Sequence, residues 1–271
     1  MTQAHPLSLV TGASAGIGAA FARALAARGH DLVLTARRVD RLEALASELR
    51  DKHGRQVTVI AADLADPAAP RQLCDALQAN GLQVDWLINN AGYGVPGTFD
   101  AVPWQKQADF IQVLMTAPTE LIWLLLPGMR ERGYGRIVNV ASLAAHVPGS
   151  AGHTLYAASK AYLVKFSQSL ALENQARGVN VCALCPGFTW SEFHDVTGTR
   201  QLMNKMPAFM WQTAEDVVDQ GIAAIERGEI VYVTGRVNRF IKRLIKVLPD
   251  RVALWLSGRE SRRYRDLKPS A

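Results

Sequence analysis

The chain has few cysteines and no long uninterrupted apolar run. Only 3 of its 271 residues are cysteine, which excludes a disulfide scaffold and predicts a reducing compartment. The longest apolar stretch, around residues 121–129, already contains Pro127 and Gly128 and is shorter than the roughly 18 residues that cross a bilayer. Residues 1–10 show neither a basic segment nor a cleavable apolar one, so no signal peptide is expected. These absences predict a soluble cytoplasmic protein.

Charge is modest and unevenly distributed. Charged residues make up 20% of the chain, and the formal net charge is +6. Residues 236–271 hold 11 of the 30 basic residues and 3 of the 24 acidic ones, a local net charge of +8, so residues 1–235 sum to −2. The cations therefore belong to a C-terminal extension, and nucleic-acid binding by the main body is not expected. A hydrophobic content of 49% excludes disorder of the whole chain.

Short β-branched runs alternate with longer stretches of helical period along residues 1–235, without an internal repeat. Most of the short runs are apolar on both faces, as are strands buried inside a parallel sheet. The pattern predicts one α/β domain over residues 1–235, a doubly wound Rossmann fold with a seven-stranded parallel sheet. The expected strands are 7–10, 31–35, 57–61, 86–89, 136–140, 179–184 and 230–233, and the expected helices are 17–28, 41–53, 70–80, 104–129, 156–177 and 214–227.

A glycine-rich turn follows the first expected strand. Residues 11–18 read Thr-Gly-Ala-Ser-Ala-Gly-Ile-Gly and lead into an Ala-rich helix. Glycines let backbone amides approach a pyrophosphate, and the positive end of the helix favours that anion. We therefore expect a dinucleotide here, with a plain tight turn as the alternative. The expected contacts are Gly12, Ser14, Gly16, Ile17 and Gly18.

The second expected strand ends in basic residues. Arg37 lies 19 residues after Gly18, about where an acidic residue would bind the ribose 2′-hydroxyl of NAD. Arg37 and Arg38 instead favour NADP(H) over NAD(H), because a guanidinium suits the 2′-phosphate; the alternative is a solvated helix start. After the third strand, Asp63 and Leu64 are expected beside the adenine, although Asp63 could instead cap the next helix.

Three polar residues follow the fifth expected strand. Tyr156 lies 14 residues after Ser142, and Lys160 lies four residues further on, at the start of a helix. Tyr156 and Lys160 therefore share a helix face, and an ammonium group beside a phenol lowers the pKa of the phenol. Such a tyrosine can exchange a proton with a carbonyl or alcohol oxygen. Ser142 can hydrogen-bond the same oxygen.

Residues 11–18, 89–92, Ser142, 156–160 and 186–187 resemble, in order and spacing, the motifs of the short-chain dehydrogenase/reductase family. The resemblance spans about residues 5–235. It implies an NADP-dependent oxidoreductase that transfers a hydride between the nicotinamide and a carbonyl or secondary alcohol. It also implies Tyr156 as proton donor or acceptor, Lys160 on the nicotinamide ribose, and Ser142 orienting the substrate. The further cofactor contacts that it implies are Asn90, Ala91, Gly92, Pro186, Gly187 and Thr189.

One position departs from the family's pattern. Family members usually carry an asparagine in the helix after the fourth strand, where it helps to hold a water-linked proton relay behind the lysine. Alignment of residues 111–115 puts Leu114 there. Leucine cannot hydrogen-bond, so we expect proton exchange to be slowed, or rerouted through Thr116 or a backbone carbonyl. The departure leaves open an alternative function, a cofactor-binding sensor or scaffold with weak or no turnover.

The substrate region is apolar. Residues 188–211 contain many large hydrophobic side chains, which either line a pocket over the nicotinamide or pack on the core. We expect a hydrophobic carbonyl compound or alcohol as substrate. No metal site is expected, because Cys182 and Cys185 point to opposite faces of a strand and the six histidines lack ligand spacing. The helices 104–129 and 156–177 resemble those through which the family forms homo-oligomers.

The C-terminal extension, residues 236–271, has the pattern of a basic amphipathic helix. Apolar residues recur at helical spacing from Val237 to Leu248, and basic residues fill the opposite face. Pro249 is expected to end this helix, and a second helix is expected from about Val252. Two roles stay open. The helix packs on the body or on a second subunit, or it lies on a membrane surface with its cations over anionic headgroups.

Overall fold

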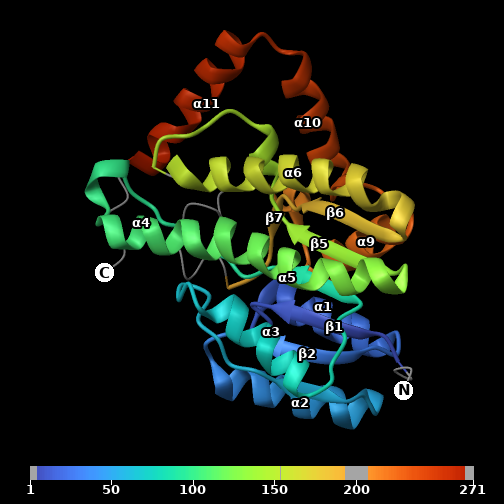
Figure 1. Cartoon of the computed structure of the whole chain (residues 1–271). Coiled ribbons are helices and arrows are strands. Elements are labelled where there is room, and N and C mark those ends of the chain that lie inside the picture. The colour runs from blue at the N-terminus through green and yellow to red at the C-terminus, as the bar shows by residue number, and fades with distance from the viewer. Residues whose placement is uncertain (1–4, 153, 193–206, 266–271) are drawn as a thin grey trace.

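The computed structural model describes residues 5–152, 154–192 and 207–265. Its centre is a parallel sheet of seven strands, which confirms the prediction (Figure 1). The strand order is β3-β2-β1-β4-β5-β6-β9. A small second sheet pairs β7 with β8. The strands are β1 (Leu7–Thr11), β2 (Asp31–Thr35), β3 (Val57–Val59), β4 (Trp86–Asn89), β5 (Gly135–Val140), β6 (Val179–Cys185), β7 (Phe188–Thr189), β8 (Trp211–Gln212) and β9 (Val231–Val233).

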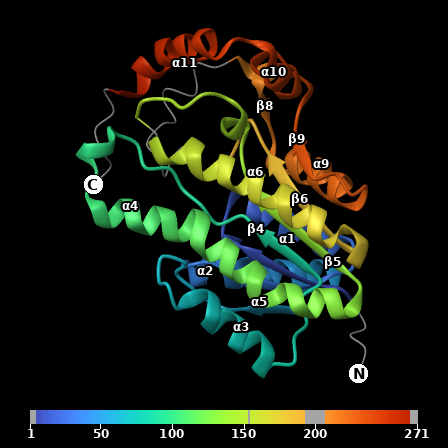
Figure 2. The same cartoon turned by 45° about the horizontal axis from the view of Figure 1, so that its top comes forward.

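Helices cover both faces of the sheet (Figure 2). One face carries α1 (Gly16–Ala27), α2 (Val39–His53) and α9 (Ala214–Glu226), and the other carries α3 (Ala69–Ala79), α4 (Trp104–Ile111), α5 (Ala117–Arg132) and α6 (Thr154–Asn174). Each face therefore has its own hydrophobic core. Cys182 and Cys185, both buried in β6, belong to different cores, which confirms that they point to opposite faces.

The sheet differs from the prediction mainly at its edge. Strand β3 stops at Val59 rather than at Ala61, because only β2 pairs with it. Two backbone hydrogen bonds, from Ile60 to Leu34 and from Ala62 to Ala36, still tie the following residues to β2. Strands β2 and β3 lie on one side of β1, and β4, β5 and β6 lie on the other side, so the strand order reverses between β1 and β4. In doubly wound sheets, ligands bind beyond the carboxyl ends of the strands at such a switch point.

Helices α4 and α5 are joined by a π-helical turn, η2 (Gln112–Thr116), into one continuous helix of 29 residues. Among the described residues, this is the one helix long and apolar enough to cross a membrane, although its sequence holds no uninterrupted apolar run of that length. Part of its apolar surface is used within the fold. Leu121, Ile122 and Met129 are buried in the core between the helix and the sheet.

The C-terminal extension forms two helices, α10 (Arg236–Val247) and α11 (Asp250–Arg265), with Pro249 between them as predicted. They form a hairpin whose turn points away from the sheet, on the side of α6 (Figures 1 and 2). We call this pair of helices the C-terminal hairpin. Its start is anchored in the body, because the Asn238 side chain is 2% exposed and packs closely against Gly187.

Candidate active site

A cavity of about 1480 Å³ opens at the carboxyl ends of the central strands. This is more than the roughly 300–1,000 Å³ of an ordinary small-molecule pocket, so it has room for a dinucleotide and a second molecule. All of the predicted site residues line it except Gly18: Gly12, Ser14, Gly16, Ile17, Arg37, Arg38, Asp63, Leu64, Asn90, Ala91, Gly92, Ser142, Tyr156, Lys160, Pro186, Gly187 and Thr189.

The glycine turn depends on its lack of side chains. Gly12 and Gly16 have φ values of 65° and 55°, a region that other residues enter only at a cost. A Cβ on Gly18 would lie 2.3 Å from the Gly12 carbonyl oxygen, so Gly18 lets α1 pack directly beneath the turn. Helix α1 has no side-chain cap and no acidic residue in its first turn. Its first amides are thus left for an anion.

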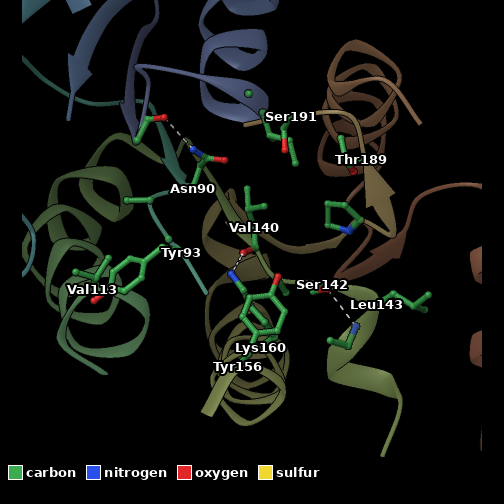
Figure 3. Close-up of a pocket in the computed structure, with 18 of the residues that line it drawn as sticks. Asn90, Tyr93, Val113, Val140, Ser142, Leu143, Tyr156, Lys160, Thr189 and Ser191 are labelled. Carbon is green, nitrogen blue, oxygen red and sulfur yellow. Dashed lines mark hydrogen bonds between the residues drawn. The ribbon is translucent and has the colours of Figure 1, made fainter. Parts of the chain in front are cut away.

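Asn90 holds the glycine turn from behind. Its Nδ2 donates hydrogen bonds to the carbonyl oxygens of Thr11 and Gly12, at 3.0 and 3.2 Å. Thr11 Oγ1 in turn accepts from the backbone amides of Asn90 and Ala91, both at 3.0 Å. Asn90 therefore points toward the turn rather than into the centre of the cavity (Figure 3). Thr11 is a site residue whose role the sequence analysis missed.

The two predicted arginines have different surroundings. Arg37 is exposed at the rim of the cavity. Arg38 donates to Ser14 Oγ from Nε and Nη2, at 3.3 and 3.0 Å, and pairs with Glu192 at 3.1 Å. Arg41 pairs with the same carboxylate. Hydrogen bonds from Arg41 and Arg38 hold the pKa of Glu192 below its usual value. Glu192 was not predicted, since only the fold brings it to these arginines.

Ser142, Tyr156 and Lys160 meet at the wall of the cavity (Figure 3). Ser142 follows β5, and its Oγ accepts a hydrogen bond from the Ala144 amide at 3.1 Å, in the short helix η3 (Leu143–His146). Tyr156, in the first turns of α6, is hydrogen-bonded to Ser142. Lys160 Nζ donates to the Val140 carbonyl oxygen at 2.8 Å and lies 5.7 Å from the centre of the Tyr156 ring. The structure thus brings all three predicted residues together.

Burial decides the protonation of this group. Desolvation raises the pKa of Tyr156, and the hydrogen bond with Ser142 opposes it. Desolvation lowers the pKa of Lys160 to about 8. The structure therefore differs from the expectation that Lys160 lowers the pKa of Tyr156: the ammonium group is turned toward the Val140 carbonyl. A neutral tyrosine beside a serine hydroxyl is equipped to donate a proton to an oxygen atom.

Leu114 lies in the π-helical turn and is 1% exposed. It packs against the segment after β4, where a Cβ on Gly92 would lie 3.6 Å from Leu114 Cγ, and it shares an apolar cluster with Tyr93 and Tyr156. The position beside Tyr156 is thus filled by hydrocarbon. Two alternative routes for proton exchange were predicted, through Thr116 or through a backbone carbonyl. Thr116 is exposed and does not line the cavity, whereas the backbone carbonyl of Val140 contacts Lys160.

The remaining wall of the cavity is apolar. From the predicted segment 188–211, Phe188 and Met210 line it, whereas Trp190 stacks on Trp211 with ring centres 4.0 Å apart. Phe193, Met203 and Met206 lie outside the described residues. The inner face of the C-terminal hairpin also lines the cavity, which the sequence analysis missed although it identified the apolar stripe. The hairpin's lining residues are Ile241, Ile245, Leu248, Ala253, Leu256 and Ser257.

Metal-binding side chains do not gather in the part of the chain that the structure describes. No group of three or more histidine, cysteine, aspartate or glutamate residues is placed to hold an ion there. Cys74, Cys182 and Cys185 are free thiols, and burial raises the pKa of Cys182 and Cys185 to about 12. These two thiols are therefore protonated packing groups.

Comparison with known proteins agrees with this geometry. Residues 7–201 match the family model described as short chain dehydrogenase. Nodulation protein G of Rhizobium sp. (strain N33) is 36% identical over 232 residues, covering 84% of this chain and 92% of that protein. A short-chain dehydrogenase from Sphingobium yanoikuyae in complex with NADPH superposes with a TM-score of 0.79 at 33% identity, covering 90% of this chain and 96% of that one. A bulky-bulky ketone specific alcohol dehydrogenase from Comamonas testosteroni has a TM-score of 0.76 at 31% identity, covering 94% of each chain.

Proposed function

The chain belongs to the short-chain dehydrogenase/reductase family, and from this we propose that it interconverts an apolar ketone or aldehyde and its alcohol with NADP(H) as cofactor. Members of the family are NAD(P)-dependent oxidoreductases that act on CH–OH groups. The observation that carries the proposal is the meeting of Ser142, Tyr156 and Lys160 on the wall of the cavity that the glycine turn also lines.

The residues present fit a dinucleotide. The turn at Gly12 and Gly18 has no space for side chains, and the first amides of α1 lack a capping side chain; both features suit a pyrophosphate. When bound, the nicotinamide supplies or accepts the hydride. In this proposal, the pyrophosphate is held by Gly12, Ser14, Gly16, Ile17 and Gly18, the 2′-phosphate by Arg37 and Arg38, the adenine by Asp63 and Leu64, and the nicotinamide half by Asn90, Ala91, Gly92, Tyr156, Lys160, Pro186, Gly187 and Thr189.

In the reductive direction, Tyr156 Oη gives its proton to the substrate oxygen, and Ser142 Oγ hydrogen-bonds the same oxygen. The raised pKa of Tyr156 keeps this proton on the phenol until the substrate oxygen becomes basic. Lys160, whose Nζ donates to the Val140 carbonyl oxygen at 2.8 Å, holds the nicotinamide ribose in this proposal. Oxidation of the alcohol uses the same atoms in reverse.

The apolar wall supports the substrate class. Phe188, Met210, Ile241, Ile245 and Leu248 line the same cavity as the catalytic group and favour a hydrophobic substrate. One similar structure is, by its name, specific for bulky ketones.

We further propose a cytoplasmic homo-oligomer, peripheral to a membrane through residues 236–271. Oligomerisation is supported by two large apolar side chains on the long helices, Trp123 at 66% and Leu172 at 75% exposure. Both would be covered in an assembly through α5 and α6.

One observation favours a second candidate, a cofactor-binding sensor or scaffold without efficient turnover. Leu114 fills the position beside Tyr156 where the family usually has an asparagine. The complete set of Ser142, Tyr156 and Lys160 favours the enzyme instead.

Fluorescence titration with NADPH and with NADH tests the cofactor. We expect NADPH to bind more tightly than NADH, and Arg37→Asp to abolish this difference in affinity. Equal affinities in the unmodified protein would refute the role of Arg37.

Turnover of apolar ketones with NADPH then tests the reaction. Tyr156→Phe should lose roughly 10²–10⁴-fold in rate while NADPH binding is retained. Retained binding without turnover in the unmodified protein would favour the sensor.

A further inference from the structure

Some apolar side chains of the C-terminal hairpin line the cavity, and others are exposed to solvent. Its inner face lines the cavity through Ile241 and Ile245 of α10 and Ala253 of α11. It is fixed to the body at both ends. Asn238 of α10 packs on Gly187, and Ser257 Oγ of α11 donates to the carbonyl oxygens of Pro148 and Gly149, at 3.3 and 2.9 Å. The hairpin therefore forms a wall of the candidate active site, and its turn projects outward (Figure 1).

The solvent-exposed side chains of the hairpin, which we call its outer face, are unusually hydrophobic for a protein surface. Among the described residues, 15 large hydrophobic side chains are exposed, and 7 of them lie on this hairpin. Isolated exposed apolar residues are ordinary, but such a concentration marks a surface that contacts something apolar. The seven are Phe240 (65% exposed), Leu244 (46%), Val247 (76%), Val252 (42%), Leu254 (57%), Trp255 (62%) and Leu256 (43%).

Cations accompany these apolar side chains. Residues 236–259 contain seven arginine or lysine residues and a single acidic residue, Asp250. Arg236, Arg243 and Lys246 of α10 are exposed, as are Arg251 and Arg259 of α11. A helix with aromatic and aliphatic residues on one side and cations along the other is the pattern of a helix that lies in a membrane interface.

Two apolar partners could cover this surface, a second copy of the chain or a lipid bilayer, and the charge of the hairpin distinguishes between them. In a symmetric contact between two copies, the same patch meets itself, so two extensions of net charge +8 would face one another. An anionic lipid surface instead attracts the cations. Each lysine or arginine near such a surface raises the affinity of the protein for the membrane by about a factor of five. The composition of the outer face therefore matches an anionic bilayer better than a second copy of the chain.

We propose that the outer face of the C-terminal hairpin docks the protein on anionic lipid bilayers, and that a long-chain carbonyl compound or alcohol passes from the lipid along the hairpin to Tyr156. Leu256 connects the two faces, because it lines the cavity and is also 43% exposed. An apolar substrate that follows this route exchanges lipid for the apolar cavity wall with little exposure to water. The delivery step rests on the proposed oxidoreductase function, whereas docking does not.

Docking is tested by cosedimentation of the full chain with vesicles. The two vesicle types are phosphatidylcholine alone, and phosphatidylcholine with phosphatidylglycerol in equal parts. We expect binding to the anionic vesicles only, weakened by salt. Arg243→Glu with Lys246→Glu should lower the affinity by about thirtyfold or more. The matched control is Lys52→Glu with Arg177→Glu, two exposed cations outside the hairpin, which should bind as the unmodified chain does.

A matched pair of exposed tryptophans tests how much the apolar side chains contribute to vesicle binding. Trp255 on the hairpin and Trp104 on α4 are 62% and 69% exposed. Trp255→Ser should lower vesicle affinity by about tenfold, and Trp104→Ser should leave it unchanged. Equal losses in both variants, or no binding of the unmodified chain to anionic vesicles, would overturn docking. So would a change in oligomer size on Trp255→Ser without vesicle binding, which would identify the outer face as a contact between copies.

Delivery is tested by comparing two substrates at a fixed NADPH concentration. A long-chain methyl ketone dissolved in anionic vesicles should be reduced more slowly, by about the loss in vesicle affinity, in the Arg243→Glu, Lys246→Glu variant. The rate with acetophenone in water should not change. If the two rates fall together, or neither falls, delivery along the hairpin is wrong. Absence of turnover and of NADPH binding, with vesicle binding intact, would refute the oxidoreductase function and leave docking standing.

Discussion

At the scale of single residues, the chemistry-bearing side chains were predictable, but several of their contacts were not. Tyr156 and Lys160 were found from their spacing on one helix, and the fold places Ser142 beside the tyrosine. The sequence could not show that Lys160 Nζ is turned toward the Val140 carbonyl, because that contact joins α6 to the end of β5. Glu192 was missed for the same reason, since its partners Arg38 and Arg41 lie more than 150 residues away in the chain.

The lowered pKa of Lys160 predicts how activity depends on pH. Its ammonium group is lost as pH rises through about 8, so reductive kcat/KM should fall above that pH while Tyr156, whose pKa is raised, stays protonated. Lys160→Arg keeps a positive charge at all accessible pH values and should move the decline to higher pH, whatever its maximal rate. The measurement is kcat/KM against pH for both proteins. An identical decline in both would assign it to a group other than Lys160.

The pairing of Glu192 predicts an effect on cofactor selectivity. Its carboxylate already engages Arg38, the side chain that we assign to the 2′-phosphate, so carboxylate and phosphate compete for one guanidinium. Glu192→Gln should tighten NADPH binding by about fivefold, which corresponds to ~1 kcal/mol for a half-exposed ion pair, and should leave NADH binding unchanged. Fluorescence titration of both cofactors measures this. Tighter binding of both cofactors would mean that Glu192 acts on the shape of the site rather than on the 2′-phosphate.

At the scale of elements, the seven strands of the main sheet were predictable because each is a short apolar run between turn signals, and among them only β3 ended clearly early, at the sheet edge. The two-residue strands β7 and β8 were not predicted, because they are too short to give a pattern. The long helix was expected as one segment, yet its π-helical turn at Gln112–Thr116 has no clear signal in the sequence. Such turns often occur at functional sites, and this one contains Leu114. The position of the C-terminal hairpin was not predictable either, because an amphipathic stripe gives the apolar face without its partner.

Leu114→Asn tests whether hydrocarbon at this turn limits proton exchange. An asparagine can hydrogen-bond a water molecule behind Lys160, so kcat should rise, and the solvent deuterium isotope effect on kcat should shrink, under conditions where proton transfer limits the rate. Leu114→Met is the control, because it conserves apolar volume without adding a hydrogen-bonding group. An unchanged rate and isotope effect in Leu114→Asn, with the protein folded, would show that the relay does not depend on this side chain.

At the scale of the whole molecule, stability should depend on two histidines, of which His30 is buried and His146 is half-buried. His30 is 7% exposed, lies against Ser8 and Trp86, and has its pKa lowered by desolvation from 6.5 to about 4. The pKa of His146 is also lowered to about 4 by desolvation. Between these values and 6.5, the unfolded chain binds protons that the folded protein does not. Acidification therefore favours unfolding in this window, and stability rises again with pH until about 6.5.

Substitution of His30 isolates one of these contributions. Between pH 7 and pH 4.5, the unmodified protein should lose roughly 2–3 kcal/mol of unfolding free energy through His30 alone. His30→Gln, which cannot take up a proton, should lose that much less over the same interval, although the lost packing on Trp86 makes it less stable at pH 7. Urea unfolding at several pH values measures the slope, and His5→Gln at an exposed position is the control. If His30→Gln shows the same slope as the unmodified protein, the imidazole is protonated equally in both states, and its burial between β1 and β4 has no part in the acid sensitivity of the fold.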